Sequence, residues 1–224
     1  MPIGVTLAAM LTLGACAPAP TAPSRTQTGA TAAPDITKID LVRRQFGRDF
    51  TVGDSQRTTV TPEIIRQHEQ SGVNYIPNHC EFIDQTVGPD SIGATFITFT
   101  AEGKGTTYTV SAQRTSIAQP APSENCDYAQ INKPGRFQSL VTPADLPRIP
   151  KGSTKNSTAR HIVSISEPQK LVIDQYRYMT WLDDNSAVSV VVVSNPFAVP
   201  ASNPIDPKFA QDVLSDAVAV LRSK

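Results

Sequence analysis

The fold class of this chain is indicated most clearly by residues 94–115, ATFITFTAEGKGTTYTVSAQRT. The two arms of this stretch are rich in Thr, Val, Ile, Phe and Tyr, which favour strands. Glu102-Gly103-Lys104-Gly105 carries the glycines that a tight reversal needs, so we predict a β-hairpin. In the second arm, Tyr108, Val110 and Ala112 alternate with hydroxyl and amide side chains. We therefore expect one face of the hairpin to be buried and the other to be wet.

Further strands are expected in the second half of the chain, over residues 136–141, 161–165, 171–182 and 188–194. Asp183-Asp184-Asn185 forms the polar turn between the last two of these strands. The segment 188–194 is apolar on both of its faces for much of its length. This pattern is typical of a strand in the middle of a sheet that is covered on both sides.

Helical patterns precede the hairpin. Residues 35–47 place Ile39, Val42 and Phe46 on one face and end at Gly47, which can accept a left-handed cap. These features predict a short amphipathic helix at the start of the domain.

Further helices are expected from Thr61-Pro62-Glu63, over residues 80–87, and from Asp206-Pro207 to the C-terminal end. The closing helix carries an apolar stripe made of Phe209, Val213, Ala217 and Val220. Helices, then hairpins, then a closing helix predict an α+β domain. We expect a twisted antiparallel sheet covered by an N-terminal helical region and a C-terminal amphipathic helix.

A different signal lies at the N-terminus, where Leu13-Gly14-Ala15-Cys16 ends an apolar run. Lipidation of an exported bacterial protein needs a thiol, small residues before it and an aliphatic residue three positions upstream, and this stretch supplies all of them. Residues 3–13 are too short to span a membrane and suit a signal-peptide core. We therefore expect residues 1–15 to be a lipoprotein signal peptide and Cys16 to be acylated. The alternative is an ordinary signal peptide with an incidental cysteine.

The first residues, Met1-Pro2-Ile3-Gly4, lack the Lys or Arg with which a secretory signal normally opens, so we expect the true start codon to lie upstream. Residues 16–35 are rich in Ala, Pro and Thr, which predicts an extended tether. Residues 36–224 are long enough for one α+β extracytoplasmic domain with a real core.

Charge and cysteine content limit the function classes. The chain holds 20 Lys and Arg against 20 Asp and Glu, which argues against a nucleic-acid binder. Once Cys16 is acylated, Cys80 and Cys126 remain, and an even pair in an exported protein most often forms a disulfide. His79 beside Cys80 could also belong to a metal-binding site, but the sequence places no further ligand at a spacing typical of such a site. We expect neither a metal nor another cofactor.

Four segments resemble an uncharacterised family of mycobacterial and other actinobacterial lipoproteins. They are Asp35–Ile39 with Phe46-Gly47, Phe99–Gly105, Ser194–Phe197 and Ala210–Arg222. This resemblance implies an exported domain held in the cell envelope, and it transfers no catalytic residue. More distantly, the layout is similar to the extracellular sensor domain of a mycobacterial serine/threonine kinase, which implies a twisted antiparallel sheet with helices and a cleft.

Candidate catalytic groups have simpler explanations. Ser164 and His161 are close in sequence, but no Gly-x-Ser-x-Gly elbow accompanies them. Asp183 and Asp184 are better explained as a solvated turn than as an acid–base pair. Gly103-Lys104-Gly105 is too short for a phosphate loop. We therefore expect no catalytic residue.

Two further groups of side chains are candidates for binding. Four cations fall within one stretch that has no acid between residues 149 and 162: Arg148, Lys151, Lys155 and Arg160. They would contact anionic lipid headgroups, each contributing about 1 kcal/mol, or form an ordinary solvated loop. Tyr176, Tyr178 and Trp181 lie on one strand and fit either a core or a ligand pocket.

The sequence thus favours a non-enzymatic lipoprotein at the outer face of the plasma membrane, anchored to that membrane by its lipid. Its domain would bind a small molecule, a lipid or another envelope component. The alternatives are a cell-envelope hydrolase or transferase and an accessory subunit of a membrane protein.

Overall fold

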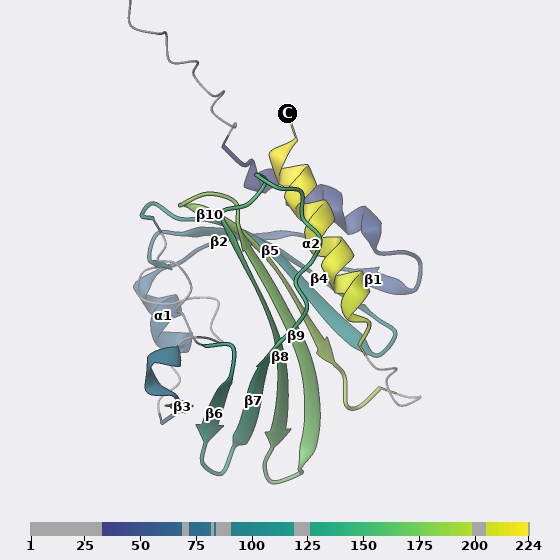
Figure 1. The fold of residues 1–224 in the computed structure, drawn as a ribbon. Coiled ribbons are helices and arrows are strands. Elements are labelled where there is room, and N and C mark those ends of the chain that lie inside the picture. The colour runs from purple at the N-terminus through teal and green to yellow at the C-terminus, as the bar shows by residue number, and fades with distance from the viewer. Residues whose placement is uncertain are drawn as a thin grey trace, which may run out of the picture. The chain divides into compact units, whose positions relative to one another are not determined.

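Ten antiparallel strands form one sheet within the part of the chain that the computed structural model describes (Figure 1), which is residues 33–68, 72–81, 83, 91–118, 126–198 and 205–223. In chain order the elements are the 3-10 helix η1 (Ile36–Gln45), β1 (Phe50–Val52), β2 (Gln56–Thr59), α1 (Pro62–His68), β3 (Asn74–Ile76), the 3-10 turn η2 (Asn78–Cys80), β4 (Thr95–Gly103), β5 (Thr106–Arg114), β6 (Ala129–Lys133), β7 (Phe137–Pro143), β8 (Asn156–Ser166), β9 (Leu171–Trp181), β10 (Ser186–Ser194) and α2 (Pro207–Arg222). The predicted α+β class is confirmed. The residues of the predicted signal peptide, Cys16 and most of the predicted tether lie outside the described residues.

The strand order is β1-β4-β5-β10-β9-β8-β7-β6-β3, with β2 also paired to β4. β10 pairs with β5 along its whole length, from Ser186 opposite Arg114 to Ser194 opposite Thr106. On its other side it pairs with β9. The predicted central position of the valine-rich strand is therefore confirmed, and so is the hairpin of β4 and β5.

The main core lies between the sheet and two helices, α2 and η1, which pack side by side (Figure 1). Val188, Val190 and Val192 of β10 are each at most 1% exposed beneath α2. The carboxylate of Asp206 caps α2 by accepting hydrogen bonds from the backbone N–H groups of Lys208 and Phe209. The apolar stripe predicted for this helix thus covers the sheet.

Aromatic rings fill the end of this core near the start of α2. The Phe46 ring lies 5.4–5.9 Å, centroid to centroid, from four other rings, each in an edge-on arrangement. These four rings belong to Phe50, Phe99, Tyr108 and Phe209. They connect the segment after η1 with the hairpin and with α2.

The opposite face of the sheet carries two smaller cores. One surrounds the disulfide between Cys80 and Cys126, whose Cα atoms are 5.5 Å apart, and this confirms the predicted pair. The other packs Ile65 of α1 against Phe96 of β4. Because these groups cover part of the hydroxyl-bearing face of the hairpin, Ser111 and Gln113 are each only 7% exposed. The expectation that this face of the hairpin is exposed to solvent was therefore wrong at the end that carries Ser111 and Gln113.

The N-terminal helix is a 3-10 helix, which corrects the predicted amphipathic helix with a left-handed cap at Gly47. Its buried residues, Ile36, Ile39 and Val42, recur every three positions, which is the period of a 3-10 helix. Phe46 ends it in an extended conformation and donates its N–H to the Arg43 carbonyl. Neither α-helix in the described part of the chain has the length and apolar composition that crossing a bilayer requires.

We predict that replacing Cys80 and Cys126 together by Ser lowers the free energy of unfolding by about 2–4 kcal/mol, because the disulfide restricts the unfolded chain. Urea unfolding of the oxidised protein and of the double variant measures this difference. Wild-type protein after reduction should match the variant. Two alkylatable thiols in the native, unreduced protein would contradict the pairing.

Candidate functional site

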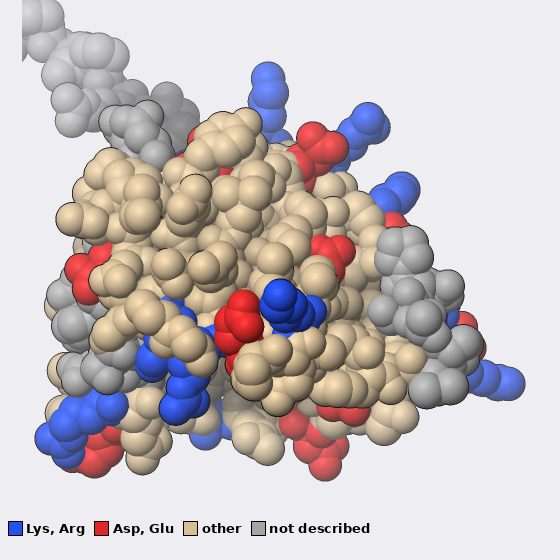
Figure 2. All heavy atoms as spheres, turned by 90° about the horizontal axis from the view of Figure 1, so that it is seen from below, with Lys and Arg blue, Asp and Glu red and all other residues tan. Residues whose placement is uncertain are grey.

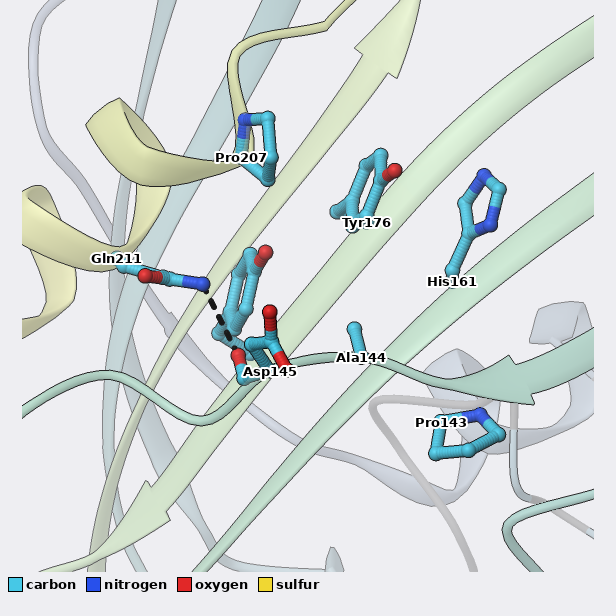
Figure 3. Close-up of a pocket in the computed structure, with 8 residues that line it drawn as sticks. Pro143, Ala144, Asp145, His161, Tyr176, Pro207 and Gln211 are labelled. Atoms are coloured by element: carbon cyan, nitrogen blue, oxygen red, sulfur yellow. Dashed lines mark hydrogen bonds between the residues drawn. The ribbon is translucent and has the colours of Figure 1, made fainter.

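The strongest candidate site is a cavity of about 350 Å³ beside the start of α2, here called the aromatic cavity (Figure 3). It is lined from the segment after β7, from β8 and β9, and from the first turns of α2. The lining residues are Pro143, Ala144, Asp145, His161, Tyr176, Tyr178, Pro207 and Gln211. Its volume falls at the lower end of the range for small-molecule sites.

Strand pairing places the rings of this cavity in a row. His161 of β8 lies opposite Tyr176 of β9, and the two rings stack with centroids 4.4 Å apart and planes 15° apart. Tyr178 follows two residues after Tyr176, so both side chains leave β9 on the same face. Their rings are nearly parallel, with centroids 6.3 Å apart.

The His161 ring is held by a carboxylate. Its Nε2 lies 2.5 Å from Oδ1 of Asp174, which belongs to the same face of β9. The Asp174 backbone N–H in turn donates to Oγ of Ser194 on β10, at 2.9 Å. Both partners of the His161–Asp174 pair are partly exposed, at 28% and 37%. The pair therefore stays open to solvent and to a ligand.

Tyr178 is fully buried, and its hydroxyl has no hydrogen-bond partner among the described residues. Burial raises its pKa to about 12, and the Gln211 side chain partly opposes this shift. Gln211 Nε2 instead donates to the Asp145 backbone carbonyl at 3.0 Å, the contact dashed in Figure 3. Burial, and then the charge of Asp174, raise the pKa of Tyr176.

The structure separates the groups that suggested a hydrolase. Ser164 lies three residues from His161 on the same strand, so the two side chains leave opposite faces of the sheet. Oγ of Ser164 is hydrogen-bonded to Oγ of Ser139 at 2.7 Å. Asp183 accepts from the backbone N–H of Asn185, and Asp184 pairs with Lys155, as expected of a solvated turn.

The other sequence candidates do not form one site either. Trp181 faces away from Tyr178, again because an odd number of residues separates them on the strand. Gly103-Lys104-Gly105 forms the end of the β4–β5 hairpin, where Lys104 pairs with Asp49 at 3.1 Å. The sulfurs of Cys80 and Cys126 lie close to His79, but their disulfide leaves no thiolate to bind a metal.

The four candidate cations lie in different settings. Arg148 and Lys151 are exposed in the segment between β7 and β8, and Lys155 forms its ion pair with Asp184. Arg160 belongs to β8, which begins earlier than predicted, and is partly buried. That burial lowers its pKa, and the charge of Asp127 opposes the shift. Contact with anionic lipid remains a prediction for these residues.

A second cavity, of about 460 Å³, lies on the opposite face of the sheet. Apolar side chains, three serines and two longer polar side chains line it: Ile131, Phe137, Ser139, Ile162, Ser164, Ser166, Ile173, Gln175, Arg177 and Val193. It lies over β6 to β10, away from His161 and Tyr176. Figure 2 shows the molecule from below the view of Figure 1, and both acidic and basic side chains lie on that surface.

Sequence reasoning considered His161 only as a partner of Ser164, and it missed Asp174, Asp145 and Gln211. The alternation of Asp174 with Tyr176 and Tyr178 on one strand face was a usable signal for the first of these. Asp145 lies in a loop and Gln211 in a helix, and no local sequence pattern predicts that these two segments meet at the cavity.

The α+β fold and the residues that form it identify the class of this protein: the chain belongs to the family described as domain of unknown function DUF5642, whose model matches residues 35–222. The expected membership in an uncharacterised family is confirmed. The lipoprotein and kinase-sensor parts of the expectation remain predictions.

The structure is also similar to the X-ray structure of an uncharacterised protein from Mycobacterium smegmatis, the Rv0999 ortholog. The TM-score is 0.69 with 23% sequence identity, over 87% of this chain and 100% of the other. This likeness supports the fold. No curated protein matches the chain.

Two tyrosines should ionise late in an alkaline titration. Burial raises the pKa of Tyr108 and of Tyr178 to about 12, whereas in the unfolded chain both ionise near pH 10. Because the unfolded state loses these protons first, stability should fall as the pH rises from about 10 to 12, by about 2–3 kcal/mol per tyrosine.

Phenolate absorbance and urea unfolding at each pH check this expectation. Tyr178→Phe should remove one of the late steps. It should raise stability at pH 7 by about 1–3 kcal/mol, because the buried hydroxyl that it deletes has no hydrogen-bond partner among the described residues. Ionisation of all five tyrosines near pH 10 in the folded protein would contradict this assignment.

Proposed function

We propose that this protein is an exported envelope lipoprotein, held at the outer face of the plasma membrane through acylated Cys16, whose α+β domain binds a small ligand without converting it. The observation that carries the binding role is the aromatic cavity, where the buried hydroxyl of Tyr178 has no hydrogen-bond partner among the described residues. An unpaired buried polar group is costly, and a ligand that supplies the missing hydrogen bond removes that cost.

The size and shape of the cavity favour a small molecule over a lipid. A volume of about 350 Å³ suits a compact ligand and leaves little room for long acyl chains. Pro143 and Pro207 offer apolar walls, while Asp145 and Gln211 bring polar groups. A few polar groups within a largely preformed pocket are the usual arrangement for orienting a small ligand.

A hydrolase or transferase is the second candidate, and the His161–Asp174 pair is what favours it, since a carboxylate-held histidine can act as a base. The binding role is favoured because Ser164, the nucleophile nearest in sequence, faces the other side of the sheet. Single replacements of His161 and Asp174 by Ala distinguish the two candidates. An enzyme would lose turnover with either variant, whereas a binder has no turnover to lose.

The lipid anchor is inferred from the sequence around Cys16. We expect Cys16→Ala to leave the protein unprocessed or to release it into the medium, because the acyl chains that hold it at the membrane are lost. Detergent-phase partitioning and intact-mass analysis of the protein from its native host measure this. Unchanged partitioning of the variant, or a wild-type protein without fatty chains, would overturn the anchor.

The cavity should retain a ligand in protein taken from its own envelope. Native mass spectrometry of the wild type is expected to show a bound small molecule that Tyr176→Ala loses, because this substitution removes one wall. Tyr128→Ala is the matched control, since Tyr128 is 68% exposed and lies outside the cavity. A ligand retained equally by both variants would place binding elsewhere.

A further inference from the structure

The lining of the aromatic cavity has no source of net positive charge. Among its eight lining residues, all of them described, there is no Lys or Arg. Asp145 contributes one negative charge. The His161–Asp174 pair contributes another when the imidazole is neutral and none when it is protonated. The lining together with Asp174, which pairs with His161, therefore carries a charge of −1 or −2 when both carboxylates are ionised.

Neighbouring residues do not reverse this sign. Asp206 caps α2 next to Pro207, and its charge helps to raise the pKa of the nearby Tyr108. Of the cations adjacent in sequence to lining residues, Lys208 follows Pro207 and is paired with Asp212 at 2.6 Å. The others, Arg160 before His161 and Arg177 after Tyr176, are strand neighbours of lining residues, so their side chains leave the opposite face of the sheet. The charges of Asp145 and Asp174 act in the same direction on the pKa values of Tyr178 and Tyr176.

The side chains of Asp145, Gln211 and Tyr178 can each accept a hydrogen bond from a ligand. The Asp145 carboxylate only accepts, and the Gln211 side chain, which donates one of its two N–H groups to the Asp145 backbone carbonyl, offers its oxygen as an acceptor and one further N–H. The Tyr178 hydroxyl is an unpaired group that can accept as well as donate. A ligand with several N–H donors would satisfy these groups together.

We propose that the aromatic cavity binds the ammonium group of a small organic amine, whose hydrocarbon stem lies against Pro143 and Pro207. An ammonium group has three donors and a positive charge, and its hydrogen bonds to a carboxylate are stronger than neutral ones. This inference rests on the proposed binding function and names the ligand class for the same site.

Three probes of similar size separate charge from shape: n-butylamine, n-butanol and butyrate. Each is titrated into the full-chain protein at pH 7 and low salt, and binding is followed by the NMR signals of Tyr176, Tyr178 and the Gln211 side-chain amide. We expect saturable shifts with butylamine and affinities at least about tenfold weaker for butanol and butyrate. Added salt should weaken amine binding.

Variants test the residues that carry the charge. Asp145→Asn should weaken butylamine binding about tenfold, because it removes the fixed negative charge with little change of shape. Gln211→Lys keeps a donor for the Asp145 carbonyl but adds a cation, so it should weaken binding as well. Asp216→Asn, on α2 and outside the cavity, is the control and should bind like the wild type. Thermal unfolding establishes that each variant is folded.

The outcomes separate this inference from the proposed function. Equal binding of butanol or butyrate, or an unchanged affinity in both Asp145→Asn and Gln211→Lys, would overturn the amine assignment. If a neutral saccharide shifts the same signals and butylamine does not, the amine assignment fails and the binding role stands. If no probe shifts these signals and the native protein carries no small molecule, both fail.

Discussion

The contact on which the rest of this structure depends is the burial of α2 against β10. Alternate valines of the central strand are almost completely covered by the helix, and the neighbouring strands are aligned through their pairing with β10. Burying an apolar side chain of this size stabilises the fold by about 1.5–3 kcal/mol. The helix also meets η1, so one contact joins the first and last elements of the domain to the middle of its sheet.

The aromatic cavity lies where the contact between α2 and the sheet ends, at the first turn of the helix. Asp206 caps α2 and Pro207 starts it, and Pro207 lines the cavity together with His161 of β8 and Tyr176 of β9. The His161 and Tyr176 side chains are partly exposed, with Tyr176 packed against the edge of the main core, whereas Tyr178 is buried within that core. A fully buried hydroxyl and a partly exposed ring pair thus become neighbours at one boundary between core and solvent. This explains why the cavity combines rigid walls with polar groups that are accessible from outside.

More of the secondary structure than of the candidate site could be predicted from the sequence. The hairpin, the central valine strand and the cap of α2 depend on local alternation and spacing, and the sequence shows these directly. The strands β2, β3 and β6 were missed because they are short and paired at or near the edges of the sheet, where partners rather than side-chain patterns define them. Asp145 and Gln211 meet only because a loop and a helix distant in sequence converge, and strand parity, not proximity in sequence, separated Ser164 from His161.

The two ends of the described domain lie side by side. The backbone N–H of Asp35 donates to the carbonyl of Leu221, and the Lys38 ammonium donates to the carbonyl of Ser223. An attachment at either end would therefore hold the domain by the same corner and present the same surface outward. Joining these ends with a short linker and opening the chain at an exposed turn, such as residues 167–170 between β8 and β9, would give a circular permutant that preserves the sheet order.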